Sequence, residues 1–196
     1  RYDPIIIDPE PPVAWHIARF KEMAEFLSGY TRTCVISFID IYKKVEKNFP
    51  QARAVSREDR IAIGKALIEI AKEYGMTIKP CAEGKELQAY GADCSGCMTV
   101  ATYETALNAG LDVPKRAKNQ RNGECACLLG TDIGAYDTCG HLCRYCYANT
   151  DPELVKSNMH RHDPKSPFLI GGSCSGDVIH EAVQKSWLDK QLRLDI

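Results

Sequence analysis

Apolar residues in the first eighty positions switch between short continuous runs and helical spacing. Three runs have the length and the β-branched content of buried strands, namely 5–7, 34–39 and 76–80. Residues 13–27 instead place apolar side chains three and four positions apart, which predicts an amphipathic helix. A second helix of this kind is expected between Ser56 and Gly75, with Ser56 and Asp59 as its capping box. Strands that alternate with helices predict βα units and a parallel sheet.

The pattern changes after position 80. Residues 81–150 are rich in turns and cysteines and contain one predicted helix, 100–108, which Gly110 closes. A last amphipathic stretch, 178–192, predicts a helix that packs on the rest of the chain. We therefore expect three regions: βα units over 1–80, a cysteine-rich region over 81–150, and a C-terminal tail with its packing helix over 151–196.

Three βα units are too few to close a β/α barrel. They form either a small open sheet or the C-terminal part of a partial parallel barrel, and we favour the partial barrel. The chain begins at Arg1 rather than at a methionine, so we expect it to be a piece of a longer protein without its N-terminal half. In parallel α/β proteins, chemistry gathers at the C-terminal ends of strands, where we place Asp3, Asp40 and Cys81.

Composition and charge narrow the classes of partner. The 196 residues are 44% hydrophobic, which is enough to bury a core. A net charge of −1 provides no basic field that would recruit nucleic acid or an anionic membrane. No apolar run reaches the ~20 residues that a membrane-spanning helix needs. We therefore expect neither nucleic acid nor a membrane as a partner.

Cysteine is the residue type that carries most of the candidate chemistry. Eight of the ten cysteines lie between positions 81 and 146. Spacings such as C-x-C and C-x₃-C-x₂-C suit ligation of one metal centre better than pairing in disulfides. Metal ligation requires thiolates that stay reduced, so we expect a reducing compartment, the cytoplasm.

The sharpest motif is the triplet Cys139, Cys143 and Cys146, which has C-x₃-C-x₂-C spacing with Tyr145 before the last cysteine. Three thiolates at this spacing can bind three irons of a 4Fe–4S cluster and leave the fourth iron open for a small molecule such as S-adenosylmethionine. Half of a zinc site is the alternative, although zinc ligands usually come in C-x₂-C pairs. The sequence favours the cluster.

A second centre is expected upstream of the triplet. Five cysteines are available for it, and four of them would complete a fully protein-ligated cluster or a tetrahedral zinc site. We choose Cys81, Cys97, Cys125 and Cys127 as the four ligands and keep Cys94 as the alternate.

The other candidates are weaker. Cys34 opens a predicted buried strand, and Cys174 has no partner at ligand spacing, so both are expected to be ordinary thiols. His141, His160 and His162 lie near the cysteines and could bind metal, shuttle protons or simply occupy turns. The cationic side chains of Lys118 and Arg121 could pair with a cofactor, or they could belong to a solvated loop.

Several strings carry a family resemblance: Arg1-Tyr-Asp-Pro-Ile, Ser37-Phe-Ile-Asp40-Ile-Tyr-Lys-Lys, Lys118-Asn-Gln-Arg121, Asp132-Ile-Gly-Ala-Tyr136, Thr138-Cys-x₃-Cys-x-Tyr-Cys-Tyr-Ala-Asn149, His162-Asp-Pro-Lys-Ser-Pro167 and Gln184-Lys-Ser-Trp187. Over essentially its whole length the chain resembles an uncharacterised bacterial and archaeal family, a domain of unknown function. The C-terminal cysteines of that family look like the cluster motif of radical S-adenosylmethionine (radical SAM) enzymes.

The resemblance implies roles for particular residues. It makes Cys139, Cys143 and Cys146 the three iron ligands and places Tyr145 against the adenine of S-adenosylmethionine. It also matches family cysteines to the four chosen ligands of the second centre. Full-length members carry further residues ahead of the string that begins at Arg1.

Three functions are therefore weighed. The first is a radical SAM-like enzyme with an unidentified substrate and a one-electron donor such as a flavodoxin or ferredoxin. The second is a non-catalytic iron–sulfur protein that transfers electrons or senses redox state. The third is a zinc-stabilised α/β binding module.

Overall fold

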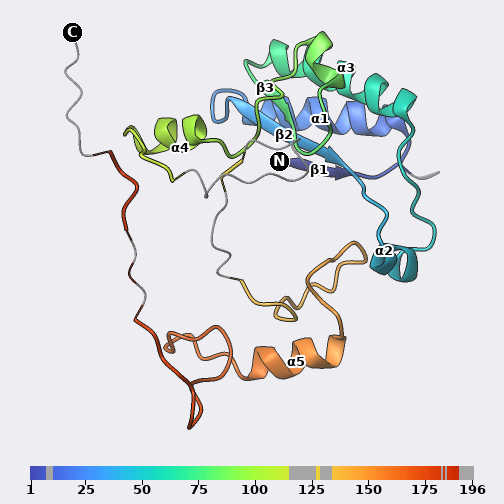
Figure 1. Cartoon of the computed structure of the whole chain (residues 1–196). Coiled ribbons are helices and arrows are strands. Elements are labelled where there is room, and N and C mark those ends of the chain that lie inside the picture. The colour runs from blue at the N-terminus through green and yellow to red at the C-terminus, as the bar shows by residue number, and fades with distance from the viewer. Residues whose placement is uncertain (8–10, 115–126, 129–133, 182, 184, 190–196) are drawn as a thin grey trace. The chain divides into compact units, whose positions relative to one another are not determined.

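The computed structural model describes residues 1–7, 11–114, 127–128, 134–181, 183 and 185–189 (Figure 1). The chain divides into two compact units. Unit 1 contains Arg1–Ile41, Gln51–Gly130 and Trp187–Ile196, and unit 2 contains Tyr42–Pro50 and Thr131–Ser186. Each unit therefore combines segments that are distant in the sequence.

Unit 1 is built on an open sheet of three parallel strands. The strands are β1 (Tyr2–Ile5), β2 (Thr33–Phe38) and β3 (Thr77–Pro80), in the order β1-β2-β3. Ile36 is the centre of the register, because it pairs with Tyr2 on one side and with Pro80 on the other. The predicted parallel sheet is confirmed, whereas the described strands form an open sheet and do not close into a barrel.

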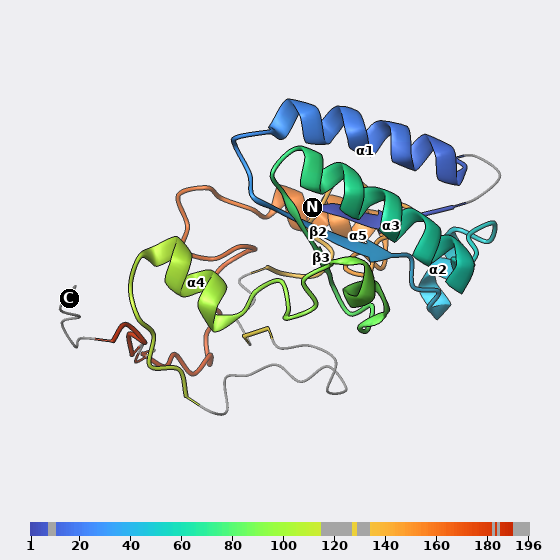
Figure 2. The ribbon, with the colours of Figure 1, turned by 90° about the horizontal axis from the view of Figure 1, so that it is seen from above.

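Two long helices cover one face of this sheet. Helices α1 (Val13–Leu27) and α3 (Arg57–Glu73) lie side by side above the strands in Figure 2. The core between helices and sheet consists of fully buried aliphatic side chains, among them Ile5, Ile36, Ile63, Leu67 and Ile78. Burial of these side chains against the sheet is the main stabilising contribution in unit 1.

Local signals set the limits of these helices. Ser56 caps α3 by accepting a hydrogen bond from the Asp59 N–H at 3.1 Å, which confirms the predicted capping box. Gly75 follows the helix with a φ of +71°, a left-handed conformation that favours glycine. Helix α1 ends in the same way, with Gly29 at a φ of +81° one residue after its C-cap.

The strand ends differ from the prediction at one position. Cys81 follows β3 directly and Asp40 lies two residues after β2, as expected. Asp3 instead lies inside β1, because the strand pairs over Tyr2–Ile5 rather than over the more apolar 5–7. Its carboxylate accepts a hydrogen bond from the Ser37 hydroxyl at 3.4 Å.

The segment after β3 forms short helices. The 3₁₀ helix η1 (Glu86–Tyr90) precedes α4 (Val100–Leu107), whose N-cap Thr99 accepts a hydrogen bond from the Thr102 N–H. Helix α4 matches the helix that the sequence predicts over 100–108. Between η1 and α4 the chain returns to β3, where the Asp93 N–H donates to the Ile78 carbonyl at 2.9 Å.

The helix predicted over 178–192 is wrong for the described residues of that stretch. Leu188 instead forms an antiparallel bridge with Leu111. The Asp112 N–H donates to the Trp187 carbonyl and the Asp189 N–H donates to the Gly110 carbonyl, both at 2.8 Å. Pairing with this distant segment satisfies the backbone groups that a helix would have bonded locally. Residues 182, 184 and 190–192 lie outside the described part.

Unit 2 contains α2 (Lys43–Asn48), the loop with the cysteine triplet, and α5 (Pro152–His160). Helix α5 begins where the Asp151 side chain accepts a hydrogen bond from the Glu153 N–H at 2.8 Å, with Pro152 in the first turn. The prediction omitted this helix, although the Asp-Pro pair is a helix-start signal.

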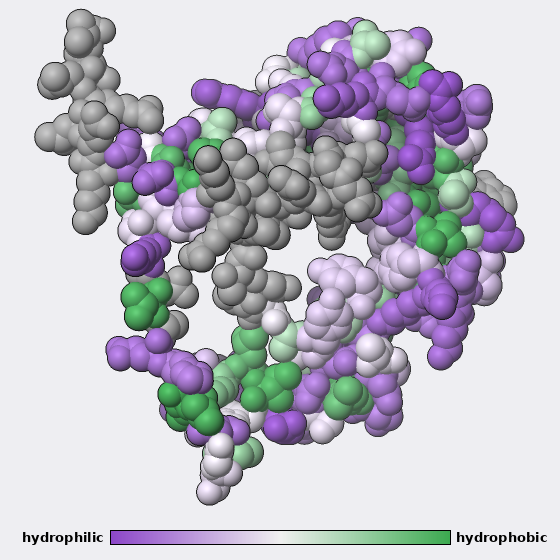
Figure 3. Space-filling model, viewed as in Figure 1, coloured by the Kyte–Doolittle hydropathy of each residue, from purple (hydrophilic) through white to green (hydrophobic). Residues whose placement is uncertain are grey.

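The surface mixes hydrophilic and hydrophobic residues on the face shown in Figure 3. In unit 2, exposed apolar side chains recur near the C-terminal end, at Phe168, Leu169, Val178, Ile179 and Val183. Within the described residues, no helix combines the length and the apolar character needed to cross a bilayer.

Candidate functional site

The three cysteines of the predicted cluster motif lie on one loop of unit 2. Cys139 and Cys143 are exposed and Cys146 is half-buried, so solution reagents can reach the loop. Leu142, between the first two cysteines, adopts a φ of +51°. This is the left-handed region that residues other than glycine rarely occupy. The chain therefore turns sharply within the motif, and all three thiols come from this short irregular segment.

Asp137 ties the beginning of this loop to its end. Its buried carboxylate accepts hydrogen bonds from the Thr150 N–H, from the Thr150 hydroxyl at 2.8 Å and from the Asp151 N–H at 3.3 Å. The main-chain bond from Thr150 is the largest cause of a lowered Asp137 pKa. Because the Asp137 carbonyl also accepts from the Asn158 side chain at 3.0 Å, the loop is attached to α5.

Asn149 provides a second attachment inside the loop. Its side-chain amide donates to the Cys139 carbonyl at 2.7 Å, and its main-chain N–H points at the Cys146 sulfur at 3.3 Å. Hydrogen bonds from N–H groups to sulfur are a common support for metal-bound cysteines. The first and third cysteines of the motif are thus held by one residue.

Aromatic residues and α2 line another side of the loop. The rings of Tyr145 and Tyr42 lie 5.7 Å apart between centroids. The Arg144 guanidinium lies 4.2 Å from the centre of the Phe49 ring and donates to the Asn48 carbonyl at 3.4 Å. These contacts position Tyr145, the predicted cofactor-binding residue, beside a second tyrosine.

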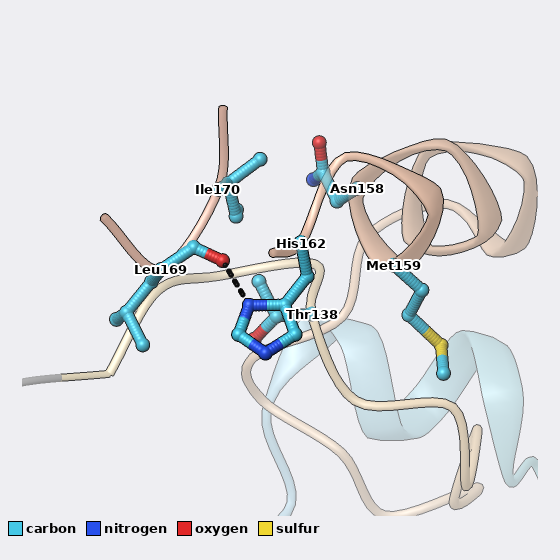
Figure 4. A pocket seen from close by; sticks show the side chains of 6 residues that line it. All are labelled: Thr138, Asn158, Met159, His162, Leu169 and Ile170. Carbon is cyan, nitrogen blue, oxygen red and sulfur yellow. Dashed lines mark hydrogen bonds between the residues drawn. The ribbon is translucent and has the colours of Figure 1, made fainter. Parts of the chain in front are cut away.

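A cavity of about 270 Å³ lies next to the start of the motif (Figure 4). It is lined by Thr138, Asn158, Met159, His162, Leu169 and Ile170. The His162 Nδ1 lies 2.9 Å from the Leu169 carbonyl oxygen, which can only accept, so Nδ1 carries the hydrogen. In the neutral ring, Nε2 then has a lone pair that can accept a hydrogen bond or a proton.

Three cysteines of the predicted second centre meet in unit 1. The Cys97 sulfur lies 3.6 Å from that of Cys81 and 3.5 Å from that of Cys127. Cys94 lines the same small cavity as these three residues. The structure thus brings together the described members of the predicted set and its alternate, whereas Cys125 lies outside the described residues.

Rigid elements hold these thiols. Cys81 continues β3, and its N–H donates to the Ile36 carbonyl at 2.8 Å. Lys79 fixes the loop of Cys94 and Cys97, because its ammonium group binds the Asp93 carboxylate at 2.8 Å and the Gly96 carbonyl at 3.3 Å. This arrangement places the C-x₂-C pair at the C-terminal end of the sheet.

Burial and close contacts shift the pKa values of the groups in and beside this set of thiols. Burial, followed by hydrogen bonds with Cys127 and Cys81, raises the pKa of Cys97 to about 12. The pKa of Arg1 is raised chiefly by its hydrogen bond with Asp3 and also by Cys81 and Cys97. A cation thus already lies beside this group of thiols.

As the side chains lie, no three His, Cys, Asp or Glu residues in the described ranges form a group that could hold a metal ion. Metal binding at either set of cysteines therefore requires its thiols to move. Cys34 is buried in β2 and Cys174 is exposed on a turn of unit 2. Residues 118 and 121, the predicted cations, lie outside the described ranges.

Sequence reasoning missed the residues that support the thiols. Asp137 and Asn149 lie within three positions of the motif ends, and polar side chains so close to a cysteine triplet were an available signal. The support at Cys127 gave no signal in the sequence, because the N–H that lies 3.3 Å from its sulfur belongs to the backbone of Met98.

Comparison with known proteins gives the family. No curated protein and no solved structure matches the chain. The family model described as "Domain of unknown function (DUF1848)" matches residues 1–148. This range includes both groups of cysteines as well as the whole parallel sheet. The chain therefore belongs to the DUF1848 family.

Proposed function

We propose that this chain is an iron–sulfur protein of the radical SAM type. Cys139, Cys143 and Cys146 would each bind one iron of a 4Fe–4S cluster, and the fourth iron would bind S-adenosylmethionine. The observation that carries the proposal is the hydrogen-bonded loop that presents three thiols at C-x₃-C-x₂-C spacing between Asp137 and Asn149.

The donors on this loop fit a cluster in two respects. The N–H of Asn149 is directed at the Cys146 sulfur, and such bonds to sulfur tune bound clusters. The exposure of Cys139 and Cys143 leaves room for a small molecule and for a protein that delivers an electron. A flavodoxin or ferredoxin is the expected donor, and the cytoplasm is a reducing compartment in which these thiols would stay available.

When bound, a cluster of this kind supplies the electron that cleaves a carbon–sulfur bond of S-adenosylmethionine. The protein's own residues would hold the cysteine loop in place and orient the bound cofactor. Asp137 and Asn149 fix the loop, and Tyr145 offers a flat apolar surface for an aromatic ring. The role of Tyr145 as a contact for adenine belongs to the same proposal.

The cavity beside the motif is a candidate for part of the substrate. Its 270 Å³ is slightly below the ~300 Å³ at which ligand pockets usually begin, so a small molecule is expected. Met159, Leu169 and Ile170 provide apolar lining, and His162 Nε2 provides one acceptor. A small, largely apolar substrate with one hydrogen-bond donor would match this lining.

The sheet is consistent with a barrel-type scaffold for this chemistry. Strands that neighbour each other in chain order, with both connecting helices on one face, are the pattern of consecutive βα units in a β/α barrel. The opposite face carries half-buried Val35, Ser37 and Lys79, which would point to the barrel interior. We include a partial barrel in the proposal on this basis.

The test uses the full chain, purified without oxygen and reduced. Adding S-adenosylmethionine should change the electron paramagnetic resonance spectrum of the cluster, and 5′-deoxyadenosine should form slowly. Cys143→Ala should lose both effects together with the iron of this cluster. Cys174→Ala is the matched control, because it removes an exposed thiol outside both groups, and it should behave as the parent.

Two results would overturn the proposal. Protein that binds iron and sulfide but does not respond to S-adenosylmethionine would be an electron carrier or redox sensor. Protein that binds only zinc after anaerobic reconstitution with iron and sulfide would exclude a cluster at these cysteines.

A further inference from the structure

Two sulfur–sulfur distances in unit 1 are close to those of ligands that share one ion. A tetrahedral zinc ion with Zn–S bonds of ~2.3 Å places its sulfur ligands ~3.8 Å apart. The two distances from Cys97, 3.6 Å to Cys81 and 3.5 Å to Cys127, are close to this value. In a 4Fe–4S cluster each thiolate binds a different iron, and the sulfurs therefore lie farther apart.

The cavity that the thiols help to line is also much smaller than a cluster. The cavity lined by Cys81, Cys94, Cys97 and Cys127 measures about 10 Å³. A single water molecule requires roughly 10–15 Å³ on this measure, so the cavity has room for one atom-sized body. A cube of four irons and four sulfides would have to push apart the end of β3 and the following loop.

The backbone around the thiols resembles that of a zinc knuckle. Cys94 and Cys97 form a C-x₂-C pair, the spacing most typical of structural zinc sites. Gly96 allows the turn between them with a φ of +112°, and Ser95 N–H bonds the Asp93 carboxylate at 2.9 Å. The Met98 N–H, just after the pair, is directed at the Cys127 sulfur at 3.3 Å and would stabilise a bound thiolate.

We propose that Cys81, Cys94, Cys97 and Cys127 bind a single tetrahedral zinc ion with a structural role. We take Cys94 as the fourth ligand because it lines the cavity, whereas Cys125 lies outside the described residues. The thiols must move to surround one ion, and rotation of cysteine side chains between staggered rotamers is the movement that we infer. Four protein thiolates leave no open position, so the ion fastens the 94–97 loop and the segment at 127 to β3.

This inference is independent of the proposed radical chemistry. The zinc site lies wholly in unit 1 and the cysteine triplet wholly in unit 2. The experiment therefore starts from the full chain in which Cys139, Cys143 and Cys146 are all replaced by serine. Any metal retained by this parent belongs to the second site.

The parent should purify with equimolar zinc, and removal of the zinc should lower its melting temperature. Cobalt(II) added in place of zinc is the probe, because tetrahedral cobalt thiolates have intense visible and near-ultraviolet absorption. Cys97→Ser should abolish tight binding. Cys94→Ser should lower the charge-transfer intensity from that of four thiolates to that of three, whereas Cys125→Ser and the control Cys34→Ser should keep the parent spectrum.

The Cys94 and Cys125 variants bind through the remaining thiolates, so the cobalt spectrum can be read even if Cys97→Ser fails to fold. Iron with acid-labile sulfide in the parent, in place of zinc, would overturn the single-ion site. A parent that binds neither zinc nor cobalt would overturn the site altogether. Loss of a thiolate in Cys125→Ser with a full spectrum in Cys94→Ser would overturn the choice of ligands.

Discussion

Asp137 and Thr150 close the cysteine loop of unit 2 from its two sides. The Asp137 carboxylate accepts hydrogen bonds from both the main-chain N–H and the hydroxyl of Thr150, thirteen positions further along the chain. All three cysteines of the motif lie between these residues. The thiols therefore belong to a loop whose ends are fixed before any cofactor binds, which reduces the entropy lost on binding.

Replacing this carboxylate tests the fixed loop. Asp137→Asn replaces one acceptor oxygen with an NH₂ donor and removes the charge, but it tolerates the left-handed backbone, since Asp137 has a φ of +57° and asparagine accepts that conformation. Supporting residues around metal ligands typically change metal affinity roughly 10–100-fold, and we expect a loss in this range for iron reconstitution. Iron content after anaerobic reconstitution is the measurement. Asp163→Asn, in a turn of the same unit, should leave iron content unchanged.

Close packing of α3 on η1 predicts a steric effect at Gly64. A Cβ added there would lie 2.6 Å from the Cδ1 atom of Leu87, a side chain that is itself buried. Gly64→Ala should therefore lower the free energy of unfolding by ~1–3 kcal/mol, measured by urea denaturation. In the Leu87→Ala background the same change should be much less destabilising, because the clashing methyl groups are absent. Equal effects in the two backgrounds would contradict the packing.

A buried carboxyl in unit 1 predicts a pH dependence of stability. Glu83 accepts from the Phe38 N–H at 2.7 Å and pairs with Arg60 at 3.1 Å, yet burial raises its pKa above the ordinary 4.5. A raised pKa in the folded state means that the folded protein binds the proton more tightly. The contribution of Glu83 to stability is therefore full below pH 4.5 and is lost as pH rises through the raised pKa.

Glu83→Gln should remove this part of the pH dependence. The difference in unfolding free energy, variant minus parent, should increase from pH 4.5 toward neutral pH, as measured by urea titrations at each pH. Glu86→Gln is the matched control, since Glu86 forms an exposed ion pair with Arg57. A constant difference across this range would show that Glu83 is not perturbed in the folded state.

The contact between Arg144 and Phe49 connects the cysteine loop to α2. A cation at 4.2 Å from an aromatic ring contributes roughly 0.5–1 kcal/mol at an exposed site. A double-mutant cycle with Arg144→Met and Phe49→Leu should give a coupling energy of this size from thermal unfolding in low salt. A coupling energy of zero would mean that α2 does not hold the loop.

Much of unit 1 could be predicted because its signals are local. The capping residue Ser56 and the glycine after α3 act within one turn of the helix, and the spacing of Ile63 and Leu67 marks its buried face. The same local rule failed at 178–192, where pairing of Leu188 with Leu111 replaced helical hydrogen bonds. Helix α5 was missed although Asp151 and Pro152 signal its start.

The sequence alone determined which residues can act as soft ligands and how they are spaced, because the C-x₃-C-x₂-C run and the C-x₂-C pair are properties of the chain itself. Only the tertiary structure decided which thiols meet. Cys97 and Cys127 are separated by thirty positions yet meet, and Cys81, at the end of β3, also contacts Cys97. Contacts over such separations depend on how the sheet and its loops pack, and the cost of closing those loops is met by burial elsewhere in the core.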